Sequence, residues 1–174
     1  AKLWREEGLS EADMIRDMGR RPVEVVITRG EEMLFVTYNE IGGANFDSAV
    51  AGHLRREVKD AAALRRQSSD RRADLQDPEV MRTVAEATRG IIDRLGGELA
   101  LCVRYHSVTF RGQPLTRAVL GGGEATPQLA EAISKSLNMK CELSDPFRSM
   151  PAQRDLGRRG LWDVSAGLAL REVN

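Results

Sequence analysis

Cysteine and histidine, which form most metal sites and many catalytic sites, are scarce in this sequence. The two cysteines, Cys102 and Cys141, lie far apart and belong to no CxxC or Cys/His cluster. They give no sign of zinc or of a disulfide framework, and they favour a reducing cytoplasm. The two histidines, His53 and His106, have no carboxylate, cysteine or serine at a suggestive spacing. We therefore interpret both as surface or helix-packing residues and not as catalytic bases.

Net charge and long apolar runs are also missing. The 26 basic and 26 acidic residues cancel, so no overall field would hold the chain on nucleic acid or on an anionic membrane surface. No apolar run approaches the roughly 20 residues that a membrane-spanning helix needs, and nothing resembles a signal peptide. The sequence therefore predicts a soluble, cytoplasmic chain without a nucleic-acid partner.

The length of 174 residues allows one ordinary core, or one core that carries a small inserted subdomain. No initiator methionine precedes the first residues, AKLWREEG, which look like the end of a helix stopped by glycine. We therefore expect a piece of a longer protein that folds as one compact unit.

The first 43 residues predict an antiparallel arrangement of strands. β-Branched and aromatic residues form two runs, VEVVIT and MLFVTYNEI, and the connection between them contains Gly30. This pattern is typical of a β-hairpin. If residues 12–16 are also extended, the chain opens with three strands that end at Gly42 and Gly43.

Residues 44–77 predict a small, mostly helical insertion. Two short and highly charged helices are expected over 45–56 and 58–67, because their apolar and small residues recur at helical spacing. The polar run SSDRRADLQD that follows is interpreted as a solvated connector.

The rest of the chain predicts helices that alternate with strands. Asp77 and Pro78 supply an N-cap and a first-turn proline for a long helix, whose apolar positions recur over residues 80–102. Gly96 and Gly97 interrupt this helix, where we expect a bend or a tight packing contact. The elements expected after it are a strand over 115–120, a helix from 126, a strand over 139–143 and a helix over 161–171.

The predicted fold class is therefore α/β. Three strands, a helical insertion, a long helix and then strand, helix, strand and helix are the order of the ribonuclease H-like fold, which actin-like ATPases use twice. We expect one such lobe over residues 1–174. Its sheet-containing core comprises residues 1–43 and 78–174, and the helical subdomain 44–77 is inserted into it.

A first candidate site lies at the end of the first expected strand, at Asp17 and Gly19. A carboxylate at a strand end, followed by glycine in a tight turn, can hold a hydrated magnesium ion while backbone N–H groups face phosphate oxygens. The alternative is an ordinary turn aspartate.

A second candidate site comprises Gly121, Gly122, Gly123 and Glu124, just before the helix that Pro127 opens. Glycines without Cβ let a nucleoside approach the backbone, and the positive end of the following helix favours phosphate. A flexible strand-to-helix turn is the alternative interpretation.

A third candidate group, on the second inserted helix, is Lys59 with Arg65 and Arg66. Flexible cationic side chains can lie over an adenine ring or contact a ribose. On a charged helix such side chains are more often simply solvated.

In this order, the segments resemble the second half of actin-like ATPases of the type IV pilus assembly (PilM-like) family. That family's second phosphate segment is similar to IRDMGRRPVEVVITRGEEMLFVTYNEIGG, and its next two helices resemble NFDSAVAGHL and VKDAAALRRQ. Its adenosine motif resembles LTRAVLGGGEATPQLAEAISKSLNMKCELSDPF, and its final helix resembles WDVSAGLALR. The resemblance covers residues 15–171.

The resemblance implies a nucleotide-facing second lobe, which would need a separate N-terminal lobe to bind ATP and magnesium and is expected to be inactive alone. It implies that Asp17 is catalytic and places the metal through a water, and that Gly19 and residues 121–124 bind the nucleotide together with Lys59 and Arg65. The parent protein would act at the cytoplasmic face of the inner membrane. There it would organise pilus or secretion machinery through membrane-anchored assembly proteins, with or without self-association.

Two departures from the family pattern favour another interpretation. Arg20, Arg21 and Pro22 follow the phosphate turn, where the family has small or hydroxyl residues, and Pro22 removes a backbone donor. Ala62 and Arg65 stand where the family commonly has glutamate and lysine. Both favour a degenerate actin-like scaffold that has lost ATP and serves protein contacts. A sugar or acetate kinase lobe and a lobe of the cell-division protein FtsA are two further alternatives.

Overall fold

The structure is a computed structural model, and it describes residues 12–17, 23–30, 32–68, 77–110, 114–148 and 159–169. The elements of this part are β1 (Ala12–Asp17), β2 (Val23–Arg29), β3 (Glu32–Asn39), α1 (Gly43–Leu54), α2 (Val58–Ser68), α3 (Pro78–Thr109), β4 (Leu115–Gly121), α4 (Pro127–Leu137), β5 (Lys140–Leu143), a 3-10 helix η3 (Arg159–Trp162) and α5 (Asp163–Ala169). Their order agrees with the predicted α/β class.

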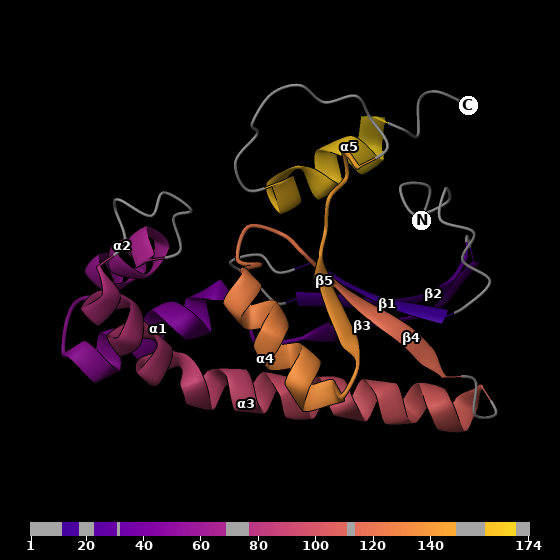
Figure 1. Cartoon of the computed structure of the whole chain (residues 1–174), viewed down its shortest axis with the longest axis horizontal. Coiled ribbons are helices and arrows are strands. Elements are labelled where there is room, and N and C mark those ends of the chain that lie inside the picture. Colours follow the sequence, from indigo (N-terminus) through magenta and orange to yellow (C-terminus); the bar gives the residue numbers. More distant parts are fainter. Residues whose placement is uncertain are drawn as a thin grey trace.

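The strands form one five-stranded sheet in the order β3-β2-β1-β4-β5. The first three strands pair antiparallel, and β4 lies parallel to both β1 and β5. Helices α3 and α4 lie on one face of the sheet, α5 lies on the other, and α1 and α2 lie together at one end (Figure 1). The parallel strands β1, β4 and β5 therefore end at the same edge.

The main core lies between the sheet and the pair α3 and α4. Alternate residues of the strands point to this layer, since successive side chains of a strand lie on opposite faces. The fully or almost fully buried members are Met14, Val25, Ile27, Ala118 and Leu120 from the strands and Leu95, Leu99 and Ile133 from the helices. The apolar periodicity of the sequence accounts for this layer.

A second, smaller core attaches α1 and α2 to the first half of α3. It contains Val50 and Ala51 of α1, Ala61 of α2 and Val84 of α3, all buried. Two helices this short depend on such packing for their stability. The division of the chain into a core and an inserted subdomain stays a prediction.

Helix α3 runs without interruption over 32 residues. Asp77 caps it as predicted, because its carboxylate accepts the N–H of Glu79 at 2.9 Å. Gly96 is buried, and a Cβ there would lie 2.8 Å from Cβ of Ser136 in α4. The tight packing contact expected at this position is therefore present, whereas Gly97 faces open space.

His106 packs inside the fold near the end of α3. Its side chain is fully buried and stacks on Phe110 with a ring-centroid distance of 4.8 Å. Among the described residues neither ring nitrogen has a hydrogen-bond partner. Burial, and next the positive charge of Arg29, lower the pKa of His106. His53 is exposed. His106 is therefore a packing residue, and His53 is a surface residue.

The end of the chain differs from the prediction. A single helix was expected over 161–171, but η3 comes first and α5 begins at Asp163. The segments AKLWREEG and 18–22 and most of the polar connector lie outside the described residues.

Candidate functional site

Asp17 and Gly121 end neighbouring strands of the sheet. Their Cα atoms are partners in the parallel ladder between β1 and β4. The structure therefore brings the first and second candidate segments to one edge, where the loops after parallel strands commonly form ligand sites. Gly19 lies outside the described residues.

The glycine turn after β4 is held from one side by η3 and α5. Gly122 has a φ of 86°, in the left-handed region that favours glycine. Its N–H lies 3.2 Å from the carbonyl oxygen of Gly160 and 3.2 Å from Oδ2 of Asp163. A Cβ on Gly123 would lie 2.8 Å from the side chain of Leu161. A side chain at position 123 would therefore displace the end of the Leu161 side chain.

Asp163 connects the ends of β4 and β5 to α5. Its Oδ1 accepts a hydrogen bond from the hydroxyl of Ser144 at 2.6 Å. The N–H of Ser144, which directly follows β5, donates to the carbonyl oxygen of Leu120 at 2.9 Å. Charge-assisted bonds of this kind are stronger than neutral ones, so Asp163 fixes the relative positions of the two loops.

Glu124, Arg65 and Asp47 form a buried ionic cluster. Nη1 of Arg65 lies 2.6 Å from Oε2 of Glu124, and its Nε and Nη2 each lie 2.8 Å from Oδ1 of Asp47. The three side chains are only 8%, 14% and 3% exposed, in the order Arg65, Glu124 and Asp47. A Cβ on Gly43 would lie 2.8 Å from Oε1 of Glu124. The carboxylate of Glu124 therefore also lies against the first turn of α1, where a helix favours negative charge.

The cluster stabilises the positive charge of Arg65. Burial alone would lower the pKa of Arg65, but the hydrogen bonds and negative charges of Glu124 and Asp47 outweigh burial and raise the pKa. The guanidinium also lies over the ring of Phe46, 5.9 Å from its centroid, within the range of a cation–π interaction. The guanidinium of Arg65 is thus held by contacts with Glu124, Asp47 and Phe46.

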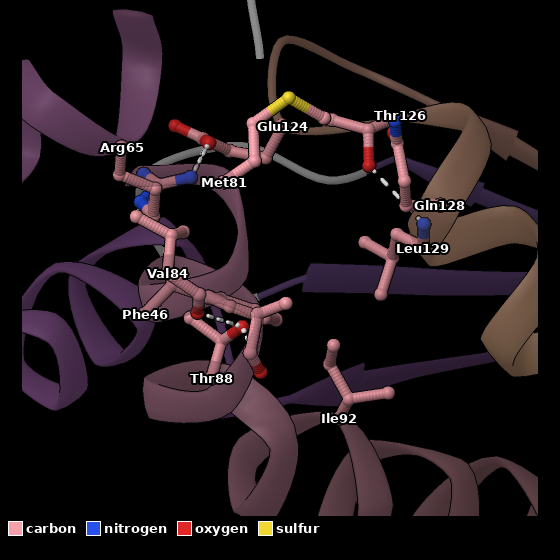
Figure 2. A pocket seen from close by; sticks show the side chains of 11 residues that line it. Phe46, Arg65, Met81, Val84, Thr88, Ile92, Glu124, Thr126, Gln128 and Leu129 are labelled. Carbon is pink, nitrogen blue, oxygen red and sulfur yellow. Dashed lines mark hydrogen bonds and ion pairs between the residues drawn. The ribbon is translucent and has the colours of Figure 1, made fainter. Parts of the chain in front are cut away.

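A cavity of about 130 Å³ lies between α1, α2, α3 and the start of α4. Figure 2 shows Arg65 and Glu124 joined at one side of it, with apolar side chains below them. The lining residues are Phe46, Arg65, Met81, Val84, Ala85, Thr88, Ile92, Glu124, Thr126, Gln128 and Leu129. A cavity of about 150 Å³ can hold a six-membered ring, so the space is about the size of one small ring.

The third candidate group is divided by the structure. Arg65 is buried in the ionic cluster, whereas Lys59 and Arg66 are exposed on α2 and do not line the cavity. Ala62, the other departure from the family pattern, is also buried. The structure therefore brings Arg65 together with Glu124 and leaves Lys59 at the surface.

The described part of the chain contains no cluster of three or more histidine, cysteine, aspartate or glutamate side chains that could hold a metal ion. None of its helices is both long and apolar enough to cross a membrane.

Three residues of the site were not predicted from the sequence: Asp47, Ser144 and Asp163. Asp47 lies in α1 and Arg65 in α2. No local sequence pattern predicts that these two side chains pair. For Asp163 the sequence gives one signal, since aspartate is common in the first turn of a helix. That signal indicates only where a helix starts. The contact of Asp163 with the glycine turn depends on tertiary structure.

Comparisons with known proteins give a result at the level of structure only. No protein-family model matches the sequence, and no curated protein matches it. Among solved structures, a chain of a PilM–PilN type IV pilus biogenesis complex matches 99% of this chain with a TM-score of 0.76 and 21% identity, over 48% of its own length.

Two other solved structures extend this likeness. The ethanolamine utilization protein EutJ from Carboxydothermus hydrogenoformans matches 97% of this chain with a TM-score of 0.68 and 15% identity, over 51% of its own length. MreB5 of Spiroplasma citri bound to ADP matches 98% with a TM-score of 0.61 and 12% identity, over 56% of its length. The chain thus spans about half the length of the structures that it matches. The PilM-like resemblance is confirmed for the fold, and the chain has the fold of the actin-like ATPases.

Proposed function

We propose that the chain is a nucleotide-facing lobe of a two-lobed, PilM-like protein that organises a type IV pilus or secretion assembly at the inner membrane through protein partners. The observation that carries the proposal is the meeting of Asp17 and Gly121 at the carboxyl edge of an actin-like sheet. The likeness to a chain of a pilus biogenesis complex supports partners of the same kind.

ATP and magnesium fit the chemistry of this edge. Asp17 would place the metal through a water, and residues 121–123 would seat the nucleoside, since glycines allow close approach of the backbone. Thr126 caps α4 directly after the glycine turn, with its hydroxyl 3.2 Å from the N–H of Leu129, so the positive end of that helix lies beside the turn. The metal would supply charge neutralisation at the phosphates. The matches to MreB5 bound to ADP and to AMPPNP support a nucleotide as the ligand.

Glu124 and Arg65 are proposed to form the base side of the site. They stand at one side of the small cavity, and Asp47 holds the guanidinium in place. Lys59, exposed on α2, would make an outer contact. Because a nucleotide site of this kind is shared by two lobes, this lobe alone is expected to bind weakly and to hydrolyse nothing.

A scaffold without ATP is the second candidate function. It is favoured by the state of Arg65, whose Nε and Nη1 already donate to Asp47 and Glu124. A ligand that took either of these donors would have to replace a carboxylate. A scaffold that binds protein partners needs the actin-like fold but does not need a nucleotide site.

Calorimetric titration of ATP with magnesium into a two-lobed protein that contains this chain tests the proposal. Asp17→Ala and Gly122→Val should each abolish or strongly weaken the binding seen with the unchanged protein. Asp93→Ala, at an exposed position of α3, is the matched control and should bind normally. Absence of binding by the folded, unchanged protein would favour the scaffold.

A further inference from the structure

Strand β3 is an edge of the sheet with little protection against further pairing. Among the described strands it pairs with β2 alone. A bulge at Leu34, which has no Cα partner in β2, disturbs only the start of the strand and leaves residues 35–39 regular. Residues 33–39 include no charged residue, proline or glycine, although charges and prolines commonly keep edge strands unpaired. The backbone of residues 35–39 is therefore open to another strand.

Apolar side chains lie on both faces of the sheet at this edge. Val36 and Tyr38 are exposed and share one face, because side chains two residues apart in a strand point the same way. Phe35 points to the other face, where its ring centroid lies 5.1 Å from that of Tyr105 in α3. A helix laid on one face would leave the other face uncovered. A further strand that extends the sheet covers both.

Helix α3 continues the apolar surface beside β3. Leu101, Tyr105 and Val108 are 59%, 53% and 78% exposed, and spacings of four and three residues place them in one stripe. Tyr105 lies about two and a half turns beyond Gly96, which faces α4, so the stripe is on the side of α3 away from α4 (Figure 1). The contact of Tyr105 with Phe35 joins the stripe to β3. A continuous exposed apolar group on two elements is typical of a protein interface.

We propose that β3 and this stripe of α3 bind a second copy of the chain across a two-fold axis. A lone extended peptide could pair with β3, but it would leave the stripe on α3 exposed. A second copy supplies a strand and a helix in the same two layers, because an axis perpendicular to the sheet keeps both copies of α3 on one face. The same surface of each copy then meets itself, as two-fold symmetry requires. This inference does not depend on nucleotide binding.

The sequence of β3 is complementary to itself in the antiparallel direction. Directly opposite residues must share a face of the sheet, so the axis passes through a residue and not between two. With the axis at Thr37, the centre of residues 35–39, Thr37 meets its own copy and Val36 meets Tyr38 of the second copy. Pairs of threonines and pairs of an aromatic with a β-branched residue are favourable across strands. No like charges lie opposite each other in this segment.

Helix α3 lies at the matching level along the strand. β3 and β4 are parallel through β2 and β1, and α3 ends just before β4 begins, so α3 runs antiparallel to β3. Four residues of a helix and two residues of a strand both span about 6 Å. Because Tyr105 contacts Phe35, Leu101 stands near the level of Thr37, where the axis passes.

An axis at Leu101 also makes the two copies of α3 complementary. It places Glu98 opposite Arg104 of the second copy, so opposite charges meet on both sides of the axis. It also places Gly97, where added atoms would enter open space, opposite the large ring of Tyr105. Ridges of one helix pack into grooves of another in this way. Strand and helix thus favour the same axis.

Analytical ultracentrifugation of a two-lobed protein that contains this chain tests the interface. The unchanged protein should show a reversible monomer–dimer equilibrium in a concentration series that extends to the high micromolar range. Leu101→Glu brings two carboxylates together on the axis and should raise the dissociation constant of the dimer at least about tenfold. Val58→Glu, at a 47% exposed position of α2, is the matched control and should leave this constant unchanged.

A charge exchange separates the interface from a general effect of charge. Glu98→Arg and Arg104→Glu each place like charges opposite each other and should weaken the dimer by about three- to tenfold. The double variant Glu98→Arg, Arg104→Glu restores opposite charges across the axis. Its dissociation constant should return to within about twofold of the unchanged protein, because the two effects are coupled.

Amide hydrogen exchange then locates the interface on the chain. Exchange in residues 35–39 should slow as the dimer forms, since their outward backbone groups become bonded. The proposal is overturned by a monomer at every concentration, by a dimer in which residues 35–39 exchange as in the monomer, or by a double charge variant as weak as the single ones. A monomer whose β3 pairs with a strand of another protein would also overturn it.

Discussion

Arg65 is the residue on which the attachment of α2 to the glycine turn most depends. Its removal would leave Asp47 and Glu124 buried without their cation, and breaking a buried ion pair in this way costs about 3 to 5 kcal/mol. We expect Arg65→Met to lower the free energy of unfolding by this amount in a urea titration. Lys59→Met, on the same helix but exposed, should change it by less than about 0.5 kcal/mol. Equal stabilities of the two variants would contradict the structural role of the cluster.

His106 should make stability depend on pH. Its pKa in the folded state lies below the ordinary value, mainly because it is buried. The unfolded state therefore binds the proton at a pH where the folded state does not, and the free energy of unfolding falls as the pH drops below about 6.5. In His106→Leu this loss between pH 7 and pH 5.5 should disappear, as measured by urea unfolding at each pH. An unchanged pH dependence would show that other groups cause it.

At the scale of elements, the packing of α3 on α4 depends on the absence of a side chain at Gly96. Gly96→Ala would push a methyl group into Ser136, and overpacking of this kind costs about 1 to 3 kcal/mol. Gly97→Ala enters open space and should instead stabilise the helix, by up to about 1 kcal/mol. Thermal unfolding of the two variants measures both effects. A stabilising Gly96→Ala would mean that the helices can separate without cost.

The type and order of the elements were accessible from the sequence because they depend on local patterns. The two β-branched runs, the N-cap at Asp77 and the proline that opens α4 each determine structure within a few residues. The start of α5 was predicted less well. There, the backbone first forms η3, whose Gly160 carbonyl bonds to Gly122, and a contact between such distant residues has no local pattern.

For the whole molecule, the sequence predicted the strands that end at the two candidate segments better than it predicted which side chains meet there. Parallel strands end at a common edge, so the meeting of Asp17 with Gly121 follows from topology alone. The pairing of Arg65 with Glu124 and Asp47 does not follow, because it requires the exact placement of α2 against α1 and the glycine turn. The separation of Lys59 from Arg65 depends on the same placement.

The most direct measurement is an experimental structure of a two-lobed protein that contains this chain, determined with magnesium and a non-hydrolysable ATP analogue. The account predicts a nucleotide between the lobes, with its nucleoside on residues 121–123 and its metal near Asp17. A nucleotide bound elsewhere, or a site between the lobes that stays empty at saturating analogue, would contradict it.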